Sequence, residues 1–170
     1  MTYRVFSVIV TSLVWLVSFQ GAVAQDRITG HNFATRLNEL LNGKSGPYQV
    51  LEDDDDETRL LKQRINIAQT NLSQILKVNT YSGTYSIETL VDAQEKLLKS
   101  QLEFLTDPVQ VHSAIKKALE TYKQIEDQTR IQFESGKLPM ADLTAAMYAR
   151  LNCEIQLLRA RKEIAEKEDQ

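Results

Sequence analysis

Apolar residues recur at steps of three and four positions along four stretches of this chain. This spacing places them on one face of an α-helix, so the pattern predicts four amphipathic helices. No stretch alternates apolar and polar residues clearly enough to predict a strand. The predicted buried faces are, in chain order, Leu61, Ile65, Ala68, Leu72, Ile75, Leu76 and Asn79; Ile87, Leu90, Val91, Leu97, Leu98, Leu102 and Leu105; Val111, Ile115, Ala118, Leu119, Tyr122, Ile125, Thr129 and Phe133; and Leu143, Ala146, Met147, Leu151, Ile155 and Leu158.

Turn-forming residues separate the predicted helices. Gly83 and Gly136 are expected to end the first and third helices, because glycine readily adopts the left-handed conformation that closes a helix. Ser86 is expected to cap the second helix. Asp107 is expected to cap the third helix and Pro108 to open it, since proline has no amide hydrogen to leave unpaired there.

The short connections between these long helices predict antiparallel neighbours. The expected fold is therefore all-α: two long antiparallel helical hairpins that form a four-helix bundle or coiled-coil sheaf. This domain covers residues 55–170, with one hairpin at about 57–105 and the next at about 108–166. Residues 25–54 are expected to form a short helix and an acidic linker, after a signal peptide at residues 1–24.

The two hairpins resemble each other in sequence. A shift of 53 positions moves Gly83 onto Gly136 and also aligns Leu90 with Leu143. This agreement favours an internal repeat, although amphipathic helices can acquire the same pattern independently.

The first 24 residues have the features of a secretory signal. A single basic residue, Arg4, precedes an apolar stretch at residues 5–19, and Ala22-Val23-Ala24 has the small-x-small pattern of a cleavage site. We predict cleavage between Ala24 and Gln25. An uncleaved membrane anchor is the alternative, but the apolar stretch is shorter than the roughly 20 residues that span a bilayer. We expect no membrane span in the mature chain.

Charge and cysteine content exclude some functions. With 20 basic and 23 acidic residues, the chain has a formal net charge of −3 and no basic stripe, so nucleic-acid binding is not expected. Cys153 is the only cysteine, so no internal disulfide can form. It lies on a predicted stripe of small residues that would allow close helix packing, and we expect it to be a buried small side chain. The stripe comprises Ala146, Ala149, Cys153 and Ala160.

No catalytic or metal-binding pattern is present. His31 and His112 have no neighbouring ligand pattern, and we expect both to be surface residues. The acidic run at residues 52–57 lacks the alternation and the glycine of a calcium loop. We interpret it as a solvated segment whose end favours the start of the next helix. The sequence therefore predicts a non-enzymatic protein without metal or cofactor.

The motif around the second predicted corner resembles the periplasmic coil of TolC-type outer-membrane efflux proteins. Its pattern is aromatic-x-x-Gly-x-x-small-x-x-Asp-Leu-x-x-Ala, formed by Phe133, Gly136, Pro139, Asp142, Leu143 and Ala146. The upstream copy keeps Gly83, Ser86, Leu90 and Ala93 but has Thr80 and Thr89 at the aromatic and aspartate positions. The resemblance covers roughly residues 60–161.

This resemblance implies that the corners are hairpin tips that contact a protein partner such as an efflux adaptor. The implied tip residues are Gly83, Thr84 and Tyr85 in the first copy and Gly136, Lys137 and Leu138 in the second. It also implies a location in the periplasm, with outer-membrane association left open. Members of the family carry membrane strands between coil segments, whereas only a short turn separates the two hairpins here. Channel activity and membrane insertion are therefore in doubt.

Two interpretations of function follow. The first is an exported interaction or assembly component of the cell envelope, for which a homo-oligomer is one compatible arrangement. The alternative is a periplasmic chaperone-like or ligand-binding helical module. A continuous apolar patch left uncovered by the fold favours the alternative, and a polar exterior favours the first. A remnant of an efflux protein without a retained role is a third interpretation.

Overall fold

The computed structural model describes residues 48–82 and 86–168. This part contains the helices α2 (Asp56–Ser82), α3 (Ile87–Phe104), α4 (Pro108–Glu134) and α5 (Met140–Glu168) and, within those residues, no strand. The predicted all-α fold class is confirmed. The predicted signal peptide, the Ala24–Gln25 cleavage site, His31 and the short N-terminal helix lie outside the described residues.

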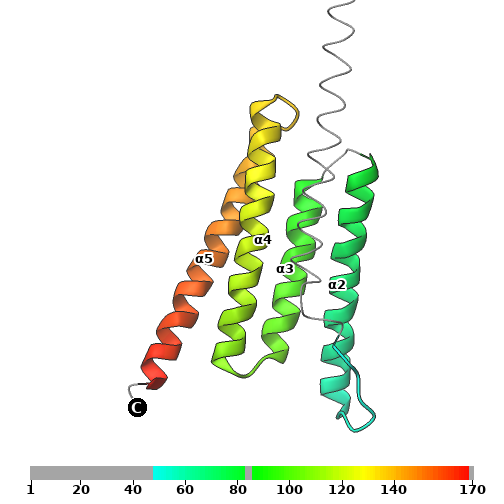
Figure 1. The fold of residues 1–170 in the computed structure, drawn as a ribbon, viewed down its shortest axis with the longest axis vertical. Coiled ribbons are helices and arrows are strands. Elements are labelled where there is room, and N and C mark those ends of the chain that lie inside the picture. The colour runs from blue at the N-terminus through cyan, green and yellow to red at the C-terminus, as the bar shows by residue number, and fades with distance from the viewer. Residues whose placement is uncertain (1–47, 83–85, 169–170) are drawn as a thin grey trace, which may run out of the picture.

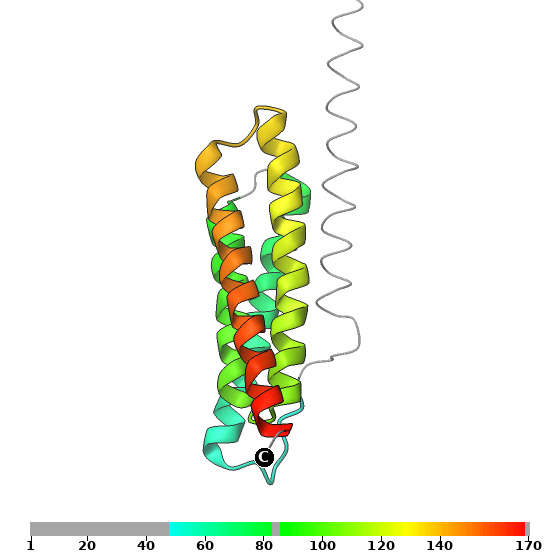
Figure 2. The same cartoon turned by 90° about the vertical axis from the view of Figure 1, so that its left-hand side faces the viewer.

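The four helices run side by side and alternate in direction along the chain (Figure 1). α2 packs against α3, and α4 packs against α5; α3 also contacts both α4 and α5. Within the described residues the backbone of α2 comes close to that of α3 but not to those of α4 and α5. α5 lies on the outside of the assembly, as two views at right angles show (Figures 1 and 2).

The helix ends follow the predicted local signals. The Ser86 hydroxyl accepts a hydrogen bond from the Thr89 amide and caps α3. Asp107 caps α4 by accepting a hydrogen bond of 3.1 Å from the Val109 amide, and Pro108 opens the helix. These caps satisfy amides at the first turn that have no partner within the helix.

A single apolar core joins the four helices. The predicted buried faces of the first three helices are largely confirmed, with Leu72, Leu90 and Ile125 among the most deeply buried side chains. Phe104 and Val111 pack against this core while partly buried. Burial of these faces removes apolar area from water, which is the main favourable contribution to the stability of such a fold.

The predicted buried face of the fourth helix is wrong in its second half. The buried residues of α5 are Leu143, Ala146, Cys153, Leu157 and Ala160, whereas Leu151, Ile155 and Leu158 are exposed. The Cys153 thiol lies 3.5 Å from the backbone carbonyl oxygen of Ile115 on α4. The small side chains of Ala146, Cys153 and Ala160 allow α5 to approach the α4 backbone this closely.

Candidate functional site

The corner between α4 and α5 has the predicted conformation. Gly136 has a φ of +73°, and its amide donates a hydrogen bond of 2.9 Å to the carbonyl of Phe133. The Lys137 amide bonds the carbonyl of Gln132 in the same way. Asp142 lies in the first turn of α5, where the helix dipole favours a negative charge.

Only part of the predicted tip surface is open to solvent. Gly136 and Lys137 are exposed, whereas Leu138 is partly buried and packs against the core. Leu138 therefore offers only part of its side chain to a partner, and its implied role as a contact residue stays a prediction. The other predicted tip, residues 83–85, lies outside the described residues. The end of α2 that precedes it is at the same end of the fold as the α4–α5 corner (Figure 1).

A buried carboxylate connects α4 to α5. Glu126 has a side chain that is only 7% exposed, and it accepts hydrogen bonds of 2.5 Å from Arg130 on its own helix and from Arg150 on α5. Arg150 also bonds Glu154 at 2.8 Å. Burial alone raises the pKa of Glu126, but the two arginines outweigh this effect and hold the pKa below its usual value. This network braces the helix pair α4–α5.

Cys153 is a packed side chain, as predicted. It is 1% exposed, and burial, with a smaller contribution from the nearby Glu154 charge, raises the pKa of its thiol to about 11. Since the thiolate is the reactive form of cysteine, this residue is unreactive near neutral pH.

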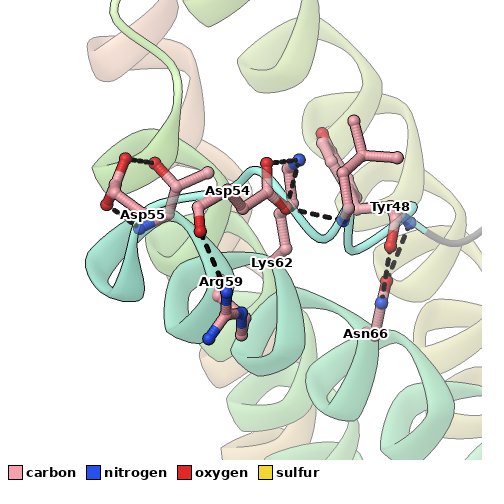
Figure 3. A network of polar contacts seen from close by, with 8 residues as sticks. Tyr48, Asp54, Asp55, Arg59, Lys62 and Asn66 are labelled. Carbon is pink, nitrogen blue, oxygen red and sulfur yellow. Dashed lines mark hydrogen bonds and ion pairs between the residues drawn. The ribbon is translucent and has the colours of Figure 1, made fainter.

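Hydrogen bonds hold the segment before α2 against that helix (Figure 3). The Tyr48 backbone exchanges two hydrogen bonds of 2.9 Å with the Asn66 side chain. The Tyr48 ring meets Phe104 edge to face, with ring centroids 5.3 Å apart. This segment therefore packs beside α2 and α3, where it covers part of the core.

Two residues of the acidic run at 52–57 make separate contacts at the start of α2. Asp55 caps the helix by accepting hydrogen bonds from the Thr58 amide and hydroxyl. This agrees with the prediction that the end of the acidic run favours the start of the next helix. Asp54 differs from the predicted solvated state, because Lys62 donates to its carboxylate at 2.6 and 2.8 Å (Figure 3). The hydrogen bond from Lys62 lowers the pKa of Asp54. Both acids have structural partners.

Two hollows in the described part of the chain are, respectively, small and open to solvent. One of about 20 Å³ lies beside Tyr48 and Gln94, which is room for a single water molecule. The Gln94 side-chain oxygen is buried without a protein hydrogen-bond partner there, and a water would satisfy it. A second hollow is a solvent-open groove between α2 and α3 with charged Glu88, Asp92 and Lys96 on its walls.

The described residues contain no cluster of His, Cys, Asp or Glu that could hold a metal ion. His112 is partly buried rather than fully exposed, with its Nε2 3.4 Å from the Arg161 Nε. None of the described helices combines the length and apolar character that a membrane crossing requires.

Among the described residues, several large apolar side chains are exposed along α5. We define the α5 outer stripe as Tyr148, Leu151, Ile155 and Leu158, whose exposed fractions are 67, 46, 46 and 62%. The stripe follows the same helix whose other face packs against α3 and α4. The sequence pattern includes three of its four members, but it predicts them in the core.

Comparisons with protein-family models, with curated proteins and with solved structures found no match.

Proposed function

We propose that this protein is a non-enzymatic, exported interaction or assembly component of the cell envelope. The α5 outer stripe is the observation that carries this proposal. α5 is already packed along its inner face, so Leu151, Ile155 and Leu158 are not needed to hold the fold together. Four large apolar side chains exposed in a row on one helix are typical of a surface that a partner covers.

The proposed place in the envelope rests on two features of the sequence. Residues 1–24 have the pattern of a secretory signal, and the Gly136 motif resembles the periplasmic coil of TolC-type efflux proteins. The left-handed Gly136, Asp142 in the first turn of α5 and the antiparallel pairs α2–α3 and α4–α5 support that resemblance. In this proposal the pairs are the hairpins of the coil, and the exposed Gly136 and Lys137 form a secondary contact at the tip.

A second candidate function is a chaperone-like module that holds apolar segments of other chains. The uncovered stripe favours this candidate by the criterion of exposed apolar surface. The stripe follows a regular helical spacing, however, which suits one defined helical partner. Suppression of aggregation of several unrelated unfolded proteins would support the chaperone-like function, whereas saturable binding of one partner would support the interaction component.

The double change Leu151→Ser and Leu158→Ser is the direct test of the proposed surface. We expect melting within about 2 °C of wild type, because both side chains are exposed, and a loss of most cross-linked partners, including any second copy, in the native envelope. The matched control is Gln156→Ser with Glu163→Ser, since both residues are exposed on α5 away from the stripe. Full partner recovery by a folded stripe variant would refute the proposal.

A further inference from the structure

The α5 outer stripe has the spacing of a coiled-coil seam. Its four members alternate at steps of three and four residues, so Tyr148 and Ile155 occupy a positions and Leu151 and Leu158 occupy d positions of a heptad. The register continues through positions that are also exposed: Ala141 and Thr144 before the stripe, and Lys162 and Ala165 after it. An exposed seam therefore extends along most of α5.

This seam points away from the rest of the fold. At 100° per residue, the stripe is centred roughly 150° around the helix from the inner face formed by Ala146, Cys153 and Leu157. α5 is also at the outside of the helix assembly (Figures 1 and 2). A second helix can therefore lie along the stripe without displacing α3 or α4.

We propose that the partner on this seam is a second copy of the chain, with the two α5 helices paired as a parallel, two-stranded coiled coil. This inference rests on the proposed function, since it names the partner of the same surface. A β-branched residue at a with leucine at d favours two strands, and Ile155 lies between Leu151 and Leu158 in this arrangement. Lys162 occupies the next a position, and a polar residue at a single a position fixes the register of the two helices.

Charges beside the seam favour the parallel orientation. In a parallel pair, each g position faces the e position five residues later on the other helix. Glu154 then faces Arg159 of the second copy, and Arg161 faces Glu166 of the second copy, so both contacts join opposite charges. Glu154 already accepts a hydrogen bond from Arg150, but a carboxylate has acceptor sites for a second cation.

The antiparallel alternative has worse electrostatics. With the stripes of two copies centred on each other, Leu151 would face Ile155, and Glu154 would face Glu154 of the second copy. No pair of opposite charges would replace those of the parallel arrangement. The two facing Glu154 carboxylates would repel each other and so disfavour the antiparallel arrangement. Such repulsion can determine the orientation of the helices even though exposed ion pairs add little affinity.

The test is disulfide cross-linking in the full-length chain, in its native envelope, with a mild oxidant. Leu158→Cys puts one thiol of each copy at a d position, where the two face each other across a parallel seam. Gln156→Cys is the matched control, because it is exposed on the same helix but outside the seam. We expect at least about fivefold more linked dimer from Leu158→Cys, since a disulfide needs Cα atoms within about 7 Å. The wild-type lane controls for Cys153, which is buried.

Orientation and partner identity are tested in the same system. Two chains are mixed, one with Tyr148→Cys and one with Leu158→Cys, each carrying a different tag. We expect few disulfide-linked dimers that contain both chains, because positions 148 and 158 face each other only in the antiparallel arrangement. If such dimers were the main product, the parallel arrangement would be overturned. Equal amounts of linked dimer from the Leu158→Cys and Gln156→Cys chains would show that the contact is nonspecific and would overturn the inference. If Leu158→Cys links only to a different protein, self-association is refuted while the proposed function stands. If it links to nothing although circular dichroism shows a folded chain, both proposals fail.

Discussion

Leu90→Ala is expected to lower the free energy of unfolding by about 2–5 kcal/mol, because it removes a fully buried side chain and leaves a cavity that packed neighbours fill only in part. Leu90 is 0% exposed and belongs to α3, the helix that contacts all three others. The loss should therefore weaken the whole fold rather than one end of it. Urea denaturation followed by circular dichroism measures the change.

Leu60→Ala is the matched control for this experiment. Leu60 is 64% exposed on α2, so its truncation should change the free energy of unfolding by less than about 0.5 kcal/mol. Equal losses for the two variants would mean that α3 does not occupy the centre of the core.

Glu126→Gln is expected to lower the free energy of unfolding by about 1–3 kcal/mol near neutral pH, since it removes a buried negative charge that two arginines contact. Arg150 would keep Glu154 as a partner, but its charge-assisted bond to Glu126 would be lost. The matched control is Glu120→Gln, an exposed acid paired with Lys123 within one helix, for which a change below about 1 kcal/mol is expected.

The stabilisation that Glu126 provides is expected to depend on pH. The pKa of Glu126 in the folded chain lies below its ordinary value of 4.5, so the ionised carboxylate stabilises the fold above that pH. As the pH falls below about 4.5 and then through the folded pKa, Glu126 becomes protonated and this stabilisation is lost. The difference between wild type and Glu126→Gln should therefore narrow on acidification. A difference that stays constant down to the acid transition would contradict the assigned charge state.

Local sequence signals were sufficient for the helix ends and for most of the core. Asp107 and Gly136 act through contacts with residues only a few positions away, so their roles could be predicted without the fold. Local signals do not determine how far Leu138 is buried, because its burial depends on how the corner packs against the core.

Local sequence signals could not predict the inner face of α5 or the contact between Glu126 and Arg150. α5 carries two apolar faces with similar spacing, and the choice between them depends on how closely α4 approaches. Glu126 and Arg150 are 24 positions apart and belong to residue types that are usually exposed. Their contact follows only from the packing of α4 against α5. The edge-to-face contact of Tyr48 with Phe104 likewise follows only from the packing of the segment before α2 against α3.

Photo-crosslinking along α5 in intact cells tests whether a partner binds the α5 outer stripe. A photoreactive amino acid is placed singly in the full-length chain at Leu151, Ile155 or Leu158, and at Gln156 and Lys137 for comparison. We expect adducts of defined mass at the three stripe positions and few or none at Gln156. Adducts at Lys137 alone would assign partner binding to the helix corner, and similar labelling at Gln156 and on the stripe would show that α5 has no specific contact surface.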